Sequence, residues 1–168
     1  MAIVSAIERN VYASHMSIFL ADMDEPDDND YDWHNEAIDL QRVCPGEAPY
    51  ELQIAVARYD VVPVRLRVVS QRPEPDLSAS HVVENDLLLP SGNLTLHGVN
   101  DVPVSETTLR VTPGRYRVRI TYLPRTDPLP ESAPEESGDH YDYLIDLWPT
   151  DEHAATDTLV QGPRVWAG

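Results

Sequence analysis

The 168-residue sequence contains no lysine, one cysteine and no apolar run longer than four residues. Because Cys44 is alone, an internal disulfide and a cysteine-rich metal site are both excluded. A transmembrane helix needs about 20 consecutive apolar residues, so we expect no transmembrane segment. Residues 1–10 do not begin with the basic segment that is typical of a secretory signal. We therefore expect a cytoplasmic protein.

Positive charge is also scarce, since 12 arginines stand against 29 acidic residues and the formal net charge is −17. Nine of the acids lie in residues 22–39 and nine in residues 131–157, and neither tract contains an arginine. Proteins that bind nucleic acid neutralise phosphates with clustered positive charge. We therefore expect no direct binding of DNA or RNA, and a partner that is either a basic protein or a metal ion.

Apolar and polar residues alternate with a period of two in residues 50–56, 64–68, 116–122 and 141–147, which predicts strands with one buried face. Shorter candidate strands lie at 15–21 and 94–98, and turn dipeptides such as Pro113-Gly114 separate the runs. The apolar phase of the alternation predicts the core residues Leu52, Ile54, Val56, Leu66, Val68, Val118, Ile120, Ile145 and Leu147.

This pattern is typical of an all-β protein, an antiparallel β-sandwich with one short helix near residues 33–41. A chain of this length usually forms one domain. We expect a single sandwich domain over residues 1–168, with acidic loops at 22–32 and 127–140.

One acidic segment partly matches a calcium-binding loop. Asp28, Asp30, Asp32 and Asp39 occupy positions 1, 3, 5 and 12 of an EF-hand-like loop. Position 6 is Trp33, where the sharp turn requires glycine, and Asp39 is shorter than the usual bidentate glutamate. We predict no metal site and no cofactor, and keep a calcium-binding module built on residues 28–39 as an alternative.

No catalytic constellation is recognisable, so we expect that the protein is not an enzyme. The segment from His34 to Glu36 contains the His-x-Glu half of a zinc deaminase signature, but the required Pro-Cys-x-x-Cys is missing. No Gly-x-Ser-x-Gly nucleophile elbow occurs. His140 lies between Asp139 and Asp142 and could be a base, although a loop histidine at the start of a strand is the simpler interpretation.

Arg115, Arg117 and Arg119 project from one face of their predicted strand. They could bind a phosphate or carboxylate. We favour ion pairs with Asp142 and Asp146, which would face the same side if the strand at 141–147 lies beside this one.

Several short motifs, in order along residues 12–148, resemble the competence protein J (ComJ) family. They are Trp33 with Glu36-Ala37-Ile38, the His-Val-Val-Glu stretch at 81–84, Leu-Pro-Ser-Gly at 89–92 and Pro-Gly-x-Tyr-x-Val at 113–118. Asp39-Leu40-Gln41 stands where the family pattern has a turn that contains glycine. The resemblance implies a small acidic cytoplasmic protein that binds and inhibits a nuclease.

We therefore predict an acidic inhibitor or immunity-type protein that binds a nuclease at its basic DNA-binding cleft, because a nuclease presents positive charge to phosphates. Trp33 would anchor the contact, since tryptophan is enriched at interface hot spots. The expected steering residues are Asp27, Asp28, Asp30, Asp32 and Glu36. Two alternatives remain: the calcium-binding module described above, and an acidic cytoplasmic domain without a partner.

Overall fold

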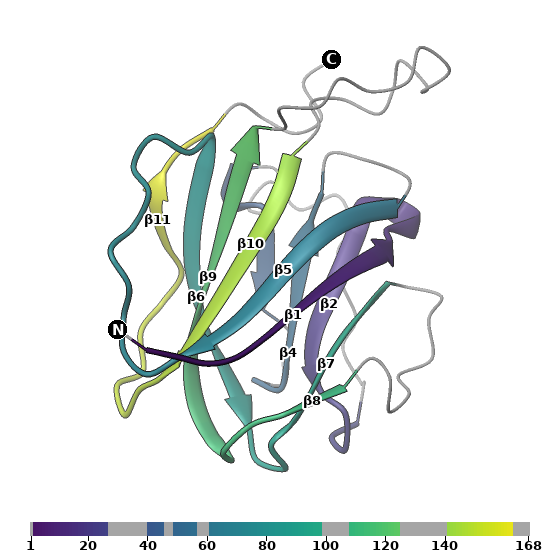
Figure 1. Ribbon diagram of the computed structural model, residues 1–168, viewed down its shortest axis with the longest axis vertical. Coiled ribbons are helices and arrows are strands. Elements are labelled where there is room, and N and C mark those ends of the chain that lie inside the picture. The colour runs from purple at the N-terminus through teal and green to yellow at the C-terminus, as the bar shows by residue number, and fades with distance from the viewer. Residues whose placement is uncertain are drawn as a thin grey trace.

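The computed structural model describes residues 2–26, 40–45, 49–56, 61–98, 108–124 and 141–162. Two sheets pack face to face in these residues (Figure 1). Sheet A has the strand order β1-β5-β10-β9-β6-β11, with bounds Ile3–Tyr12, Val61–Val69, Tyr141–Pro149, Gly114–Pro124, His81–Leu89 and Asp157–Val160. Sheet B has the order β3-β4-β2-β7-β8, with bounds Val43–Pro45, Glu51–Ala55, Ser17–Asp22, Asn93–Gly98 and Thr108–Arg110.

The prediction of an all-β sandwich is confirmed. One strand pair departs from the expected antiparallel order, because β10 runs parallel to β5 and antiparallel to β9. Of the predicted helix near 33–41, residues 33–39 lie outside the described residues, and Leu40 and Gln41 are helical. A short 3-10 turn, η1 (Ser14–Met16), joins β1 to β2. No helix in the described ranges is long and apolar enough to cross a membrane.

All nine predicted core residues are buried, with exposed fractions of 4% or less. They belong to one cluster between the two sheets, which also contains Tyr122 and Tyr143. Alternation therefore identified the inner face of both sheets correctly, because each inward side chain of these strands meets the opposing sheet.

The prediction that the outer face of the 50–56 strand is exposed to solvent is wrong. Glu51 and Gln53 point away from the core but are 5% and 1% exposed. Gln53 lies between Phe19 of β2 and Cys44 of β3 in the strand register, and its amide nitrogen donates a 3.0 Å hydrogen bond to the hydroxyl of Ser17. The outer face of sheet B is thus buried at this strand.

Candidate interaction surface

The predicted partner-binding residues Asp27, Asp28, Asp30, Asp32, Trp33 and Glu36 lie outside the described residues. The structure does describe where their acidic loop begins. Asp22 is 3% exposed, and its carboxylate accepts hydrogen bonds from the backbone N–H and the hydroxyl of Ser91, at 2.8 and 2.5 Å. The amide of Asn93 donates to the Asp24 carboxylate at 2.5 Å. These two acids fix the start of the loop and are not free charges.

The residues that follow the loop are fixed by a buried histidine. The backbone N–H of Gly162 donates to Nδ1 of His81 at 3.0 Å, so the ring's proton is on Nε2 and is donated to the carbonyl of Gln41 at 3.0 Å. Burial lowers the pKa of His81 to about 4, the bond to Gln41 raises it in part, and the positive charge of Arg42 lowers it further. His81 is therefore neutral near pH 7 and uses both ring nitrogens.

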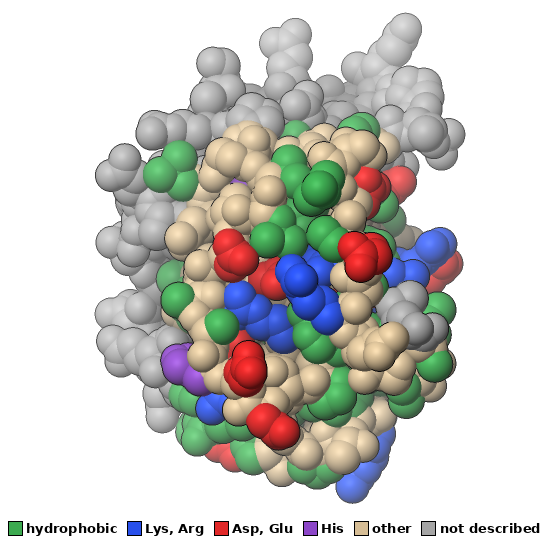
Figure 2. All heavy atoms as spheres, turned by 90° about the vertical axis from the view of Figure 1, so that its left-hand side faces the viewer, with side chains coloured by type: hydrophobic (Ala, Val, Ile, Leu, Met, Phe, Trp, Pro, Cys, Tyr) green, Lys and Arg blue, Asp and Glu red, His purple; other side chains and the backbone are tan. Residues whose placement is uncertain are grey.

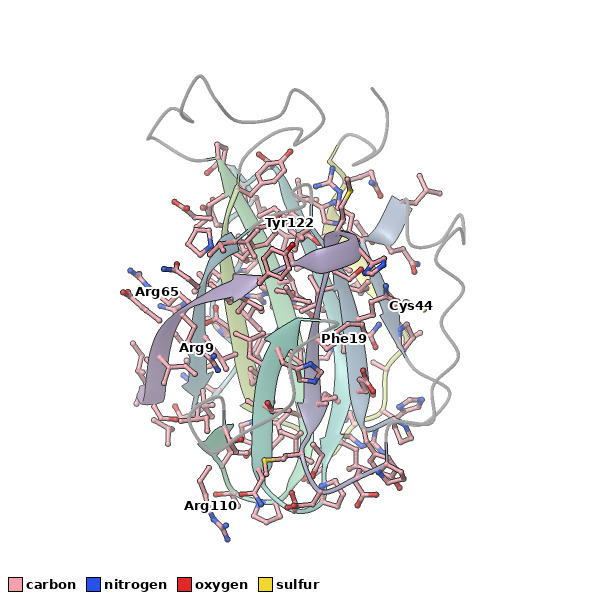
Figure 3. The ribbon with its side chains drawn as sticks, turned by 90° about the vertical axis from the view of Figure 1, so that its right-hand side faces the viewer. Arg9, Phe19, Cys44, Arg65, Arg110 and Tyr122 are labelled. Atoms are coloured by element: carbon pink, nitrogen blue, oxygen red, sulfur yellow. The ribbon has the colours of Figure 1, made fainter. Side chains whose placement is uncertain are left out.

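Tyr122 of β9 joins the two sheets at the same end of the sandwich (Figure 3). Its hydroxyl donates to the carbonyl of Ala55 in sheet B at 2.5 Å, and burial raises its pKa well above the usual value. The guanidinium of Arg42 lies 5.0 Å from the Tyr122 ring and 5.8 Å from the Tyr141 ring. Arg42, Tyr141 and Gly162 thus meet at one end, so the segments before residue 40 and before residue 141 attach to the same end.

Charged side chains cover the centre of the outer face of sheet A, where basic groups gather with acidic groups around them (Figure 2). One row crosses four neighbouring strands in the order Arg67, Asp146, Arg119, Glu84. Arg67 donates to both carboxylate oxygens of Asp146, at 2.7 and 2.9 Å, and this bond raises the pKa of the Arg67 guanidinium. The charges alternate along the row, so each is compensated by a neighbour.

The same network holds two outer segments against the sheet. Arg119 donates to the carbonyl of Pro73 at 2.8 Å. Arg117 donates to the carbonyls of residues 154 and 155 and, at 2.9 Å, to Asp86. Burial alone would raise the pKa of Asp86, but hydrogen bonds from the backbone of residue 154, from Arg117 and from His153 lower it below its usual range.

The predicted partners of the arginine stripe are corrected by these contacts. Arg117 and Arg119 pair with Glu84 and Asp86 of β6 rather than with the acids of β10. Arg115 also pairs with Asp86, at 3.4 Å. Asp146 pairs with Arg67 on its other side, and Asp142 lies opposite Leu123 in the register. These arginines therefore make contacts within the sheet, since Arg117 and Arg119 are only 8% and 2% exposed.

Trp148 is 6% exposed, and the guanidinium of Arg119 lies 5.1 Å from its ring. It is therefore a buried residue and not a surface anchor. His140 and the carboxylates of the alternative calcium site, Asp28, Asp30, Asp32 and Asp39, lie outside the described residues. Within the described part of the chain, no group of three or more His, Cys, Asp or Glu side chains could hold a metal ion.

Sequence reasoning missed the strands β1, β3, β6, β8 and β11, and also the hydrogen bonds that His81 makes with Gln41 and Gly162. The signal for β6 was present, because Glu84 and Asp86 are spaced by two, as are Arg115, Arg117 and Arg119. The alternation of charged and apolar residues in β6 is not visible in the sequence, because apolar residues also occupy outward positions. Val82 is one of them, and it is buried.

These features define a class: a two-sheet sandwich in which a mixed six-stranded sheet faces an antiparallel five-stranded sheet. The crystal structure of ComJ, an inhibitor of the DNA-degrading activity of NucA, from Bacillus subtilis, is similar, with a TM-score of 0.65 and 14% sequence identity over 89% of this chain and 100% of that one. The structure titled Crocagin biosynthetic gene J has a TM-score of 0.56 and 20% identity, over 89% and 99% of the two chains. The chain has a ComJ-like fold.

No family model matches the sequence. No curated protein matches it either.

Proposed function

We propose that this chain is an inhibitor or immunity-type protein, and not an enzyme, that binds a nuclease in the cytoplasm by charge complementarity at the nuclease's DNA-binding cleft. The observation that carries the proposal is a net charge of −17 on a ComJ-like fold, because ComJ itself inhibits a nuclease. An acidic protein can occupy a basic cleft that otherwise binds phosphates.

In this proposal the acidic loop steers the partner and Trp33 anchors it. Charged groups at the rim of an interface mainly raise the association rate, whereas a buried aromatic residue slows dissociation. The loop residues that would pair with partner arginines or lysines are Asp27, Asp28, Asp30, Asp32 and Glu36.

The test uses the DNA-degrading activity of an extract from the source organism. The chain is removed with a specific antibody, and degradation of plasmid DNA is measured before and after purified chain is added back. We expect depletion to raise the activity and add-back to lower it, with less inhibition as ionic strength rises. Poly-L-glutamate, added at equal total charge, is the control. If inhibition is only a non-specific effect of negative charge, poly-L-glutamate should inhibit as strongly as the chain. If neither depletion nor add-back of the chain changes the DNA-degrading activity, the proposal is overturned.

A further inference from the structure

A pocket of about 520 Å³ opens at the end of the sandwich where β8 leads into β9 (Figure 1). Its floor is the end of the hydrophobic core, because Val68, Val111 and Tyr116 line the pocket and belong to the core cluster. Val4 and Pro113 also line it and are exposed, so they form part of its rim. A concave site of this size with a mainly apolar lining is typical of small-molecule binding.

Backbone hydrogen bonds hold the walls of the pocket in place. The N–H of Val111 donates to the carbonyl of Gly92 at 2.8 Å, and the N–H of Thr150 donates to the carbonyl of Arg115 at 3.0 Å. Gly92 has a φ of 75°, and a Cβ at this position would collide with the carbonyl oxygen of Val111. The segment 110–116 is therefore fixed to its neighbours on both sides, and the pocket is formed before any ligand binds.

The charged groups that line the pocket are positive, in contrast to the chain as a whole. They are Arg110 and Arg115, and none of the described lining residues is Asp or Glu. The guanidinium of Arg115 pairs with Asp86 at 3.4 Å. Arg110 extends from the end of the fold (Figure 3), and its guanidinium donates to the neutral amide oxygen of Asn93 at 3.3 Å. Arg110 is thus the charged group at this pocket that is available to a ligand.

This arrangement matches a molecule with an apolar chain and a single carboxylate. A guanidinium binds a carboxylate through two parallel hydrogen bonds, and an apolar chain on the floor of the pocket is removed from water. A net charge of −17 disfavours anions over the rest of the surface. An anion therefore binds only where a local positive charge and apolar contacts act together.

We infer that this pocket binds an aliphatic carboxylate, with the carboxylate on Arg110 and the chain against Val68 and Val111. The inference is independent of the proposed function, since neither the acidic loop nor a nuclease takes part in it. It assigns a small-molecule site to the end of the sandwich.

The first test compares three probes on the purified parent chain by isothermal titration calorimetry. Octanoate has both parts of the expected ligand, butanoate keeps the carboxylate with a shorter chain, and octan-1-ol keeps the chain without the charge. We expect octanoate to bind at one site, and the other two to bind at least about fivefold more weakly, because each lacks one of the two contributions. Amide chemical shifts should change within residues 110–116 when octanoate is added.

The second test uses variants of two exposed residues of the pocket. Arg110→Gln removes the positive charge, and Val4→Glu adds a negative charge at a rim position that is 69% exposed. Each should weaken octanoate binding about fivefold or more. Arg110→Lys keeps the charge and should lie within about twofold of the parent.

Matched controls make the same changes outside the pocket. They are Arg65→Gln, at a side chain that is 59% exposed, and Leu77→Glu, at a residue that is 67% exposed. Both should bind octanoate as the parent does. Thermal unfolding midpoints show which variants remain folded, and the affinities are compared among these.

Four results would overturn the inference. They are no binding of octanoate to the parent, equal affinity for octanoate and octan-1-ol, shifts confined to residues outside the pocket, and unchanged affinity in both folded pocket variants. A loss of affinity in the controls that equals the loss in the pocket variants also overturns it, because this would indicate a general response to charge.

Discussion

Glu84 of β6 and Arg119 of β9 face each other across the strand pair, and one carboxylate oxygen of Glu84 lies 2.8 Å from both Nε and Nη2 of Arg119. The two side chains are 5% and 2% exposed. A buried ion pair contributes little net stability over apolar residues of equal size, but removal of one partner leaves an uncompensated buried charge. The pair therefore makes sheet A sensitive to any change at either position.

Replacement of Glu84 by Gln should lower the free energy of unfolding by about 3–5 kcal/mol, because the buried guanidinium of Arg119 keeps its charge and loses its ion-pair partner. The matched control is Glu8→Gln, which breaks the exposed pair with Arg65 and should cost at most about 1 kcal/mol. Urea denaturation of both variants gives the two values. Equal costs for the two changes would contradict the assignment of Glu84 to a buried network.

Stability should fall as the pH drops from about 6.5 to about 4 because of His81, whose pKa in the folded protein is about 4 against a usual 6.5. The unfolded chain binds more protons in this window, so falling pH favours unfolding. The lowered pKa of His81 corresponds to about 3 kcal/mol in the free energy of unfolding. This stability is present in full above pH 6.5 and is lost as the pH falls to about 4. Urea denaturation at several pH values should show a shallower dependence in His81→Asn, and parallel curves would contradict the prediction.

Replacement of Ile120 by Ala should lower the free energy of unfolding by about 2–5 kcal/mol, as expected for a large-to-small change at a buried site. Ile120 is 0% exposed and belongs to the core cluster. Leu77→Ala, at an exposed loop position, is the matched control and should change stability by less than about 0.5 kcal/mol. A loss of under 1 kcal/mol at Ile120, by the same denaturation assay, would argue against its place in the core.

Simultaneous change of Asp27, Asp28, Asp30 and Asp32 to Asn should slow association with the nuclease, because rim charges act mainly on the association rate. The dependence of that rate on ionic strength should also become shallower. Stopped-flow or surface-based kinetics at two salt concentrations measure both effects. If the association rates of parent and variant agree at low salt, this loop does not steer the partner. The candidates then become the acids of the second tract around Glu135, Glu136, Asp139 and Asp142.

Trp33→Ala should change the dissociation rate constant and not the association rate constant. Loss of a packed aromatic anchor raises the dissociation rate and costs about 2 kcal/mol or more of binding free energy. The association rate should remain close to that of the parent, since no charge is changed. Trp148→Ala is not a suitable control, because Trp148 is buried under Arg119. A variant with unchanged dissociation kinetics would remove Trp33 from the interface.

Alternation was sufficient to predict strands whose outer face carries charges, such as β9, where Arg115, Arg117 and Arg119 interrupt the apolar phase. It failed for the outer face of β4, because Glu51 and Gln53 look like exposed residues in the sequence and are buried in the fold. Burial of a polar side chain depends on what packs over it, and a local pattern does not contain that information.

The sequence also did not indicate which acids and arginines of neighbouring strands would form ion pairs. The guess that Asp146 would neutralise Arg119 required β10 beside β9, which is correct, but Arg67 on the other neighbour of β10 binds Asp146 with two hydrogen bonds. Glu84 was not considered as a partner, because β6 was not predicted as a strand. Strand order is set by long-range packing, so a choice among several acids could not be made from spacing alone. The predicted site residues 27–36 lie outside the described residues and stay a prediction.

The position of β10 constrains how the chain can be made. In sheet A it fills the place between β5 and β9, although some 70 residues separate it in sequence from β5. Before residues 141–149 are synthesised, β5 and β9 therefore lack the strand that lies between them, and β6 also lacks its neighbour β11, which follows β10 in the sequence. Unpaired strand edges are prone to pair with other chains, so we expect the chain to be most prone to aggregation between the synthesis of β9 and the arrival of β10.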